Sequence, residues 1–292
     1  MLSVGGVEIA IVWLATLGAS VGLIAGMFGV GGGFLLIPLL HVVLNVPLPI
    51  AIGSGLCQTI ASSLGSLLRY RKLGHAETRL DLLLLGGSIP GVTLGTMLLG
   101  ALTGMGSLTI FGKEIPMISV IVSICFMLVF FSVSLMLWFK APGSSDDNIE
   151  PGPLSRFRLP PLVNFPIAEL KDISAPLTCY IGLSLGVLSG LLGIGGGVIL
   201  MPIMLYGFGF NIRKAAGTGI VVILVVSVIG TIQHARLGNV HLGLATILMI
   251  GSASAAQVGA SLTQQLPART LRRGLALIIV AANVAFAFKV FG

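Results

Sequence analysis

The chain has very little charge. Of its 292 residues only 9% are charged, whereas 55% are hydrophobic. A soluble globular domain carries about 25% charged residues. With so few, the chain cannot cover a water-facing surface, and most of its outer surface must face lipid. The composition therefore excludes a soluble enzyme or binding module and predicts a protein of the lipid bilayer.

Acidic residues, cysteine and histidine are also scarce. There are nine Asp and Glu against 16 Lys and Arg, with three cysteines and four histidines. Basic residues in membrane-protein loops usually set orientation, so the positive charge does not predict a nucleic-acid partner. No HExxH or paired Cys/His spacing occurs, so neither a metal nor a cofactor is expected. The cysteines lie in or beside apolar segments and are predicted to be free thiols; they are Cys57, Cys125 and Cys179.

Long uncharged runs are present instead. A transmembrane helix needs about 20 apolar residues, so each run must hold one or several spans. The runs cover residues 9–68, 82–112, 115–139, 173–212 and 237–268. Glycine clusters and prolines divide them. The pattern predicts an all-α polytopic transmembrane bundle of about eight to ten helices, at 9–28, 33–44, 50–68, 81–104, 117–139, 176–192, 197–210, 215–235, 242–264 and 272–290.

Two of the expected segments are too short to span. At 1.5 Å per residue, segments 33–44 and 197–210 reach only about 18–21 Å. The hydrocarbon core is about 30 Å thick. We therefore expect both segments to be half-helices or re-entrant pieces, or to be extended by irregular backbone.

The two halves of the sequence are copies of one unit. Residues 26–38 read GMFGVGGGFLLIP and residues 190–202 read GLLGIGGGVILMP, with seven of 13 positions identical at an offset of 164. Such a repeat predicts duplicated architecture. We assign residues 1–140 to a first transmembrane repeat, 141–175 to a polar linker on the cytoplasmic side, and 176–292 to a second transmembrane repeat.

The loops predict that the two copies are inverted in the membrane. In three pairs of equivalent loops, one member is more basic than the other, and nine basic residues can be placed inside against two outside. This satisfies the positive-inside rule and puts both termini outside. If the short second segment returns to its own face, the N-terminus moves to the cytoplasm.

The paired glycine clusters are the strongest functional signal. Each helical glycine costs about 1 kcal/mol relative to alanine, so consecutive glycines break a helix. Broken backbone at membrane depth persists only where protein buries it or where it lines a wet cavity. Inverted-repeat transporters place such breaks at the substrate site, where helix N-termini attract anions. The alternative is tight helix packing. The candidate binding residues are Gly29, Gly31, Gly32, Gly33, Phe34, Gly193, Gly195, Gly196, Gly197 and Val198, with Pro38, Pro202, Gly53, Gly55, Gly217 and Gly219 as structural positions.

Small polar residues follow each cluster. Ser54, Gln58 and Ser62 are spaced i, i+4, i+8 and therefore share one helical face. The candidates in the second copy are Thr218, Ser227, Thr231 and Gln233, and Gln257 is a second amide expected to be buried. Hydroxyl and amide groups bind an oxyanion without fixed charge. The alternative for each is a hydrogen bond to its own helix or to a neighbouring helix.

The two glycine motifs resemble the duplicated signature of the sulfite exporter family, also called the TauE/SafE family. The resemblance covers the hydrophobic repeats and not the linker. It implies export of sulfite, sulfoacetate, thiosulfate or related sulfur-containing anions across the inner (cell) membrane of bacteria. It also implies that the glycine-cluster residues and the prolines that follow them are functional positions.

The expected function is transport and not catalysis. No acidic residue falls inside an expected span, with Glu8 and Asp81 at edges, so coupling through a carboxylate is not expected. Export can instead follow the membrane potential, which gives about 2.3 kcal/mol per 100 mV for one charge. The partners are a small anion and the bilayer, and a homodimer is left open. An anion channel and an uptake carrier for thiosulfate or sulfate are the alternatives.

One sequence pattern points to an enzyme. Residues 18–22 fit the G-x-S-x-G pattern around Ser20. That pattern marks a hydrolase only at a strand-to-helix turn, whereas here it falls in the middle of an expected helix. We therefore expect no enzymatic activity.

Overall fold

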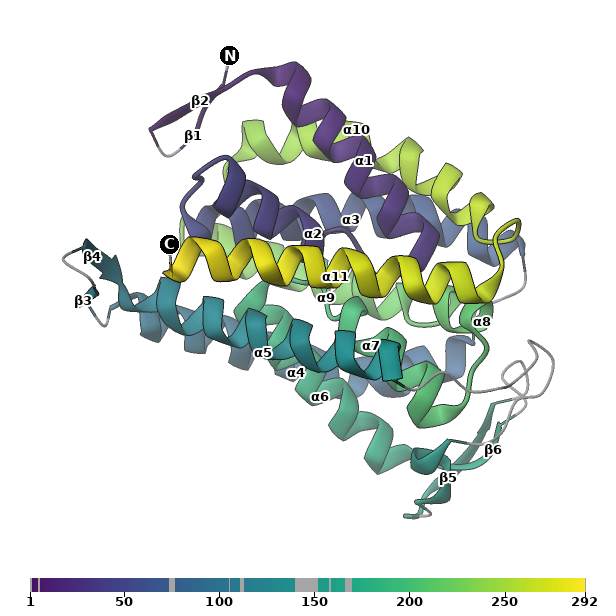
Figure 1. Cartoon of the computed structure of the whole chain (residues 1–292). Coiled ribbons are helices and arrows are strands. Elements are labelled where there is room, and N and C mark those ends of the chain that lie inside the picture. Colours follow the sequence, from purple (N-terminus) through teal and green to yellow (C-terminus); the bar gives the residue numbers. More distant parts are fainter. Residues whose placement is uncertain are drawn as a thin grey trace.

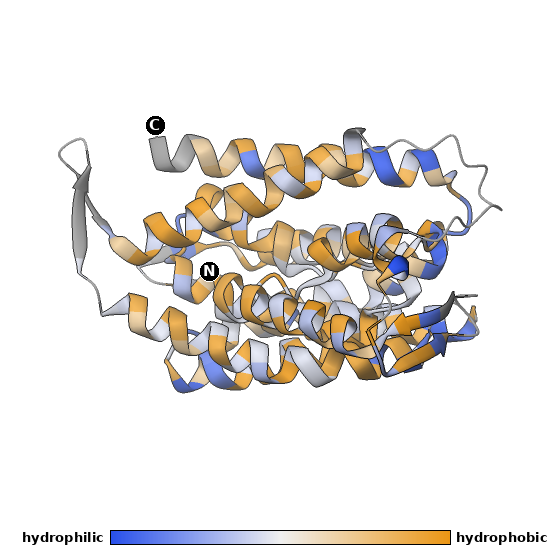
Figure 2. Cartoon of the chain, turned by 90° about the horizontal axis from the view of Figure 1, so that it is seen from below, coloured by the Kyte–Doolittle hydropathy of each residue, from blue (hydrophilic) through white to orange (hydrophobic). Residues whose placement is uncertain are grey.

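The structure is a bundle of long apolar helices. The computed structural model describes residues 2–4, 6–73, 77–104, 106–110, 113–139, 152–157, 159–165 and 170–291. In this part of the chain, eight helices are long and apolar enough to cross a membrane. The prediction of an all-α polytopic bundle is confirmed. Figure 2 shows the apolar flanks of the helices, with hydrophilic residues toward the ends of the bundle.

Corresponding helices occur in both halves (Figure 1). The first half contains α1 (Ile11–Phe28), α2 (Gly33–Pro38), the π-helix η1 (Leu39–Val43), α3 (Leu48–Lys72), α4 (Thr78–Thr103) and α5 (Met117–Phe139). The second contains α6 (Ala175–Leu192), α7 (Gly197–Pro202), the π-helix η3 (Ile203–Phe208), α8 (Ile212–Gly217), α9 (Ile220–Arg236), α10 (Leu242–Leu262) and α11 (Ala268–Phe291).

Short antiparallel hairpins and one helical turn complete the described chain. Each hairpin is a separate two-stranded sheet. They are β1 (Leu2–Val4) with β2 (Val7–Ile9), β3 (Ser107–Ile110) with β4 (Lys113–Pro116), and β5 (Leu162–Phe165) with β6 (Leu170–Ser174). The turn is the 3-10 helix η2 (Pro153–Arg156). The last hairpin and η2 belong to the segment expected to link the two halves.

The short segments after the glycine clusters end in π-helix. Pro38 and Pro202 occupy the last position of α2 and α7, and η1 and η3 follow directly. Proline has no N–H to donate and its ring crowds the preceding turn, so regular α-helical hydrogen bonding stops there. The expectation of short, interrupted helices is met, with bounds Gly33–Val43 and Gly197–Phe208.

One expected helix is divided. The segment 215–235 was expected to be continuous, but α8 ends at Gly217 and α9 begins at Ile220. Gly219 has a φ of +91°, which an L side chain rarely adopts. The equivalent Gly53-Ser54-Gly55 lies within the continuous helix α3. The prediction for this segment is therefore wrong at Thr218 and Gly219.

The first helix of each half packs on the third long helix of the other half. α1 lies along α10, and α6 lies along α4. Glycines bring the backbones together, since a Cβ on Gly22 would lie 2.5 Å from the Cα of Ser252, and one on Gly186 would collide with the Ser88 carbonyl. Gly22 and Gly186 are 164 residues apart, as are Ser88 and Ser252. The packing is therefore reciprocal between the halves, while their inversion across the membrane remains a prediction.

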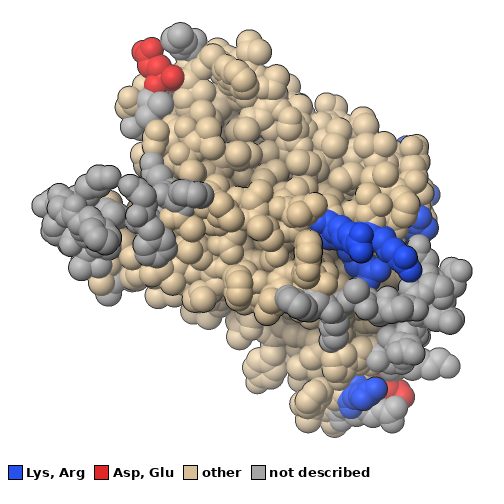
Figure 3. Space-filling view, viewed as in Figure 1, with Lys and Arg blue, Asp and Glu red and all other residues tan. Residues whose placement is uncertain are grey.

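Basic side chains gather at one end of the bundle (Figure 3). The β5–β6 hairpin and α8 lie at this end in Figure 1, whereas the β3–β4 hairpin and the C-terminus lie at the other. The segment that joins the halves therefore approaches the basic end. This arrangement is the one that the positive-inside rule expects for a cytoplasmic linker.

Candidate functional site

The two glycine clusters form loops that touch each other inside the bundle. We call residues 29–33 the first glycine loop and residues 193–197 the second glycine loop. A Cβ added to Gly33 would lie 2.5 Å from the carbonyl oxygen of Gly193. A Cβ added to Gly197 would collide with the carbonyl of Val30. Segments 164 residues apart in the sequence therefore meet at one point, and only glycine permits so close an approach.

The loops also need glycine for their backbone conformation. Gly31 and Gly195, in equivalent positions, have φ angles of +74° and +70°. Residues with a Cβ rarely adopt this left-handed region. Both glycines contact the same two side chains, Thr59 of α3 and Ile223 of α9. Thr59 and Ile223 are themselves 164 residues apart. Equivalent residues from the two halves thus contact both loops.

The second residue of each helix that follows a loop has an unpaired amide. The Gly33 N–H donates to Thr59 Oγ1 over 2.9 Å. Among the hydrogen bonds of the described residues, the backbone N–H groups of Phe34 and Val198 have no protein acceptor. Both residues have fully buried side chains. The first N–H groups of a helix lack an intrahelical partner and carry the positive end of its dipole. The loops can therefore offer hydrogen-bond donors to an anion.

Gln58 is the most unusual polar residue near the loops. Its side chain is fully buried, and neither amide atom has a partner among the described residues. The amide lies directly against Gly32, because a Cβ on that glycine would overlap it. An unpaired buried polar group costs about 1–3 kcal/mol. Such a cost is unusual in a native protein and points to a ligand position.

Two serine hydroxyls repeat this pattern. Ser63 of α3 and Ser227 of α9 are 164 residues apart, and both are buried. Neither hydroxyl has a partner within the described structure. The Oγ of Ser227 lies 3.3 Å from the position of a Cβ on Gly195. Both belong to the small polar residues that follow the glycine clusters, and Ser227 is one of the candidates expected in the second copy.

Three other predicted polar residues are occupied by protein hydrogen bonds. Ser54 Oγ accepts from the His241 N–H over 3.2 Å, so it supports the start of α10. Ser62 Oγ donates to the Thr59 carbonyl over 3.2 Å. Thr218 Oγ1 accepts from the Glu77 N–H over 3.2 Å. The alternative interpretation, that these groups bond the protein itself, fits all three.

Gln257 is not at the site. Its side chain is exposed on α10, so the expectation of a second buried amide is wrong. Ser20 lies within α1, where its hydroxyl donates to the Thr16 carbonyl over 2.8 Å. It is not on a strand-to-helix turn, so the hydrolase pattern lacks the context that gives it meaning.

An acidic residue expected at the edge of a span is fully buried. Asp81 lies in the first turn of α4, and its side chain is 0% exposed. Its Oδ1 accepts a hydrogen bond of 2.7 Å from the Gly219 N–H. Asp81 therefore lies at the edge of its span, as expected, whereas the burial of its side chain was not predicted. Acids are common in first turns of helices, so the sequence offers no signal of this burial.

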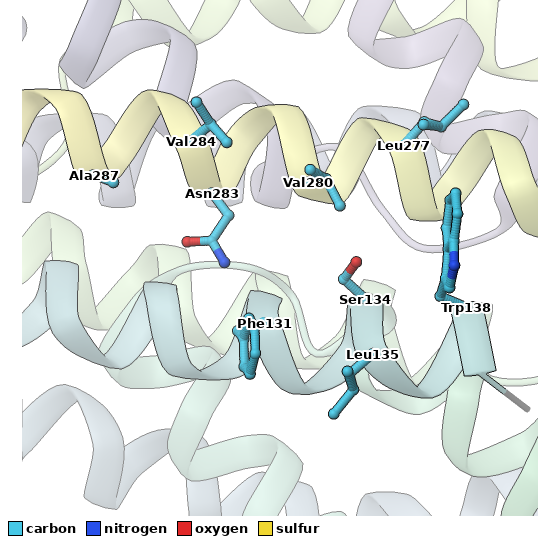
Figure 4. A pocket seen from close by; sticks show the side chains of 9 residues that line it. All are labelled: Phe131, Ser134, Leu135, Trp138, Leu277, Val280, Asn283, Val284 and Ala287. Carbon is cyan, nitrogen blue, oxygen red and sulfur yellow. The ribbon is translucent and has the colours of Figure 1, made fainter.

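A hollow in the described part of the chain lies away from the glycine loops. It measures about 520 Å³ and opens between α5 and α11 (Figure 4). Its lining is mostly apolar, with Ser134 and Asn283 as polar members, and the Asn283 amide donates to the Met127 carbonyl over 3.3 Å. An apolar groove of this kind fits lipid tails better than a small anion. A smaller hollow lies beside Tyr180 and Ser184 of α6.

Comparison with known proteins identifies relatives over nearly the whole chain. The model of the sulfite exporter TauE/SafE family matches residues 14–286. The probable membrane transporter protein YunE of Bacillus subtilis is 24% identical, over 91% of this chain and 93% of the relative. YjnA of the same organism, also a probable membrane transporter, is 28% identical over 92% and 96%. A probable membrane transporter of Haemophilus influenzae is 26% identical over 91% and 95%.

No solved structure matches the chain significantly. The three relatives named above are bacterial, and eight helices in the described residues can cross a bilayer. The chain is thus a multi-pass bacterial membrane protein. Since the family model covers almost all of the sequence, the chain belongs to the sulfite exporter TauE/SafE family of membrane transporters.

Proposed function

We propose that the protein exports a small sulfur-containing anion such as sulfite, sulfoacetate or a related organosulfonate, and that it has no enzymatic activity. The substrate site is the contact between the two glycine loops. The observation that carries the proposal is Gln58, a buried amide without a partner that lies against Gly32. Membership of a transporter family supports the general activity.

The chemistry of this site suits an oxyanion. The unpaired N–H groups of Phe34 and Val198, the Gln58 amide and the hydroxyls of Ser63 and Ser227 are all neutral donors. Together they satisfy several oxygens of a sulfonate or sulfite without a fixed positive charge. Neutral donors keep binding weak enough for release, which a transporter needs at every cycle.

We propose alternating access as the mechanism. The reciprocal packing of α1 on α10 and of α6 on α4 supports two units related by an inverted repeat. Rocking of one unit against the other exposes the glycine loops first to one side and then to the other. Outward movement of a negative charge is favoured by an interior-negative potential, at about 2.3 kcal/mol per 100 mV.

An anion channel and an uptake carrier for thiosulfate or sulfate are the competing functions. A carrier saturates and exchanges labelled for unlabelled substrate across the membrane, whereas a channel does not. Proteoliposomes loaded with unlabelled sulfite and exposed to labelled sulfite distinguish the two. Accumulation of label followed by decay identifies a carrier. The direction of net anion movement under an imposed potential then separates export from uptake.

The binding site is tested first in detergent. Sulfite, sulfoacetate, thiosulfate, taurine and sulfate are screened for an increase in thermal stability, since a ligand at 100 times its Kd stabilises by about 2.7 kcal/mol. We expect Gln58→Leu to abolish the shift that the best ligand gives. Gln257→Leu is the matched control, because the Gln257 side chain is exposed on α10 and does not belong to the site. An unchanged ligand shift in Gln58→Leu contradicts the proposed site.

A further inference from the structure

Asp81 carries an unused oxygen in a fully buried position. Its Oδ1 is bonded to the Gly219 N–H, whereas Oδ2 has no partner among the described residues. The side chain is 0% exposed. A buried carboxylate with one unpaired oxygen is costly as an anion unless it is paired or protonated. The position therefore calls for a cation or a proton at Oδ2.

The helix opposite Asp81 is broken at the point of contact. α8 ends at Gly217 and α9 begins at Ile220, so the Gly219 N–H lies at an interrupted helix end. The equivalent residues 53–55 stay within α3, so the interruption is particular to the second half. Unwound backbone at membrane depth is found in transporters where it meets a coupling ion.

The break is linked to the proposed substrate site by direct contact. A Cβ on Gly29, at the start of the first glycine loop, would collide with the carbonyl of Ala216 in α8. Ala216 lies three residues before Gly219, to which Asp81 is bonded. The Asp81–Gly219 hydrogen bond is thus connected to the first glycine loop through α8.

The charged surroundings of Asp81 are mixed. Glu77, just before α4, and Arg71, near the end of α3, are the charged groups whose fields act on it, and their effects on the carboxylate are opposite in sign. The helices packed on α4 carry the titratable side chains Cys125 of α5, Cys179 and Tyr180 of α6, and His234 and Arg236 of α9. Arg79 lies on α4 itself, α3 also carries Cys57, Arg69, Tyr70 and Lys72, and α8 carries Arg213 and Lys214.

We propose that Asp81 is a proton-binding site that couples proton movement to anion transport at the glycine loops, an inference that rests on the proposed function. Oδ2 takes up one proton from water and the carboxylate becomes a neutral acid. The loss of charge weakens the bond that Oδ1 accepts from Gly219, and the α8–α9 break relaxes. Inward movement of a proton and outward movement of an anion are both favoured by an interior-negative potential.

A proton fits this position better than a metal ion. Within the residues that the structure describes, no group of three or more His, Cys, Asp and Glu side chains could hold a metal. A hard cation such as Na⁺ or Ca²⁺ needs several oxygens around it. A proton needs only one acceptor oxygen, and Oδ2 provides it.

Infrared difference spectroscopy of the purified protein tests proton binding without any substrate. Titration from neutral to acidic pH should produce the C=O band of a protonated carboxylic acid. Asp81→Asn should remove this band, and Asn retains the oxygen that accepts from Gly219. Glu8→Gln, which removes an exposed carboxylate of β2, should leave the band in place. A band that persists unchanged in Asp81→Asn overturns the assignment.

Flux tests the coupling. In proteoliposomes, acidification of the receiving side should accelerate export of labelled sulfite or thiosulfate several-fold. The Asp81→Asn variant should lose that acceleration. It should still exchange labelled for unlabelled anion. Wild-type export that ignores the pH gradient ends the coupling inference and leaves the proposed function standing. If neither anion moves under any condition, the proposed function loses its support, and the infrared result still decides whether Asp81 binds a proton.

Discussion

Tyr70 and His234, 164 residues apart, make the same contact in the two halves of the molecule. The Tyr70 hydroxyl donates to the carbonyl of Gly26 over 3.1 Å. His234 Nε2 lies 3.0 Å from the carbonyl of Gly190 and therefore carries the proton. Each carbonyl belongs to the residue three positions before a glycine loop. Both side chains are fully buried, so each loop is held by one buried donor from the long helix that follows it.

We expect Tyr70→Phe to lower stability. The Tyr70 oxygen also lies 3.0 Å from Thr263 Oγ1, so the variant removes a small network at the end of α1. Loss of one partner from a buried hydrogen bond costs about 1–3 kcal/mol. Thermal unfolding in detergent measures this, with Tyr180→Phe as control because Tyr180 is 69% exposed. Equal unfolding temperatures for the two variants would contradict a supporting role for Tyr70.

Two adjacent glycines of α4 should respond in opposite ways to alanine. A Cβ on Gly87 would collide with the Cys179 carbonyl of α6, whereas one on Gly86 would lie 3.7 Å from the nearest atom, Cys179 Sγ. Overpacking costs about 1–3 kcal/mol, and Gly→Ala within a helix otherwise gains about 0.5–1 kcal/mol. Gly87→Ala should therefore unfold at a lower temperature than wild type, and Gly86→Ala at the same or a higher one. An unchanged unfolding temperature for Gly87→Ala would mean that α4 and α6 pack less closely than described.

The unpaired serine hydroxyls should separate stability from binding. Ser227→Ala removes a buried group that has no partner in the described structure, so the free energy of unfolding should stay constant or rise by about 1 kcal/mol. Affinity for the transported anion should fall. Ser63→Ala should behave in the same way, because Ser63 is the equivalent residue.

Ser88→Ala is the control for these variants. The Ser88 hydroxyl bonds the Leu84 carbonyl over 2.8 Å and the Gly182 carbonyl over 3.0 Å, so its loss should cost about 0.5–1.5 kcal/mol without change in affinity. Thermal unfolding and ligand titration are measured on the same samples. A Ser227→Ala variant that loses stability and keeps full affinity would assign the hydroxyl a packing role.

The uncharged runs and the internal repeat were sufficient to predict the helices and the glycine loops. Both follow from strong local rules, since lipid excludes charge and consecutive glycines end a helix. The contact between Gly33 and Gly193 could also be predicted from the sequence, because equivalent helix breaks in two repeats meet near the middle of a transporter.

Tertiary contacts decide the features that local sequence patterns do not predict. The sequences Gly217-Thr218-Gly219 and Gly53-Ser54-Gly55 are nearly the same, yet the helix is interrupted only at the former. At this interruption the free N–H of Gly219 donates to Asp81 of α4. The exposure of Gln257 could not be predicted from the sequence for a different reason. Membrane helices such as α10 are apolar on the lipid side and on the packed side, so the pattern does not reveal which face is buried.

Equivalent loops should open to opposite sides of the membrane if the repeats are inverted. Leu73 follows α3 and Leu237 follows α9, and the two are 164 residues apart. In a variant whose three cysteines are replaced, Leu237→Cys should react with a membrane-impermeant maleimide in intact cells. Leu73→Cys should react only after permeabilisation, because the basic residues near it favour the cytoplasmic side. Labelling of both from the same side would rule out inversion, and a reversed result would mean that the basic end of the bundle faces outward. Since the proposed alternating access requires each unit to mirror the other, this pair of cysteines tests the mechanism before any substrate is identified.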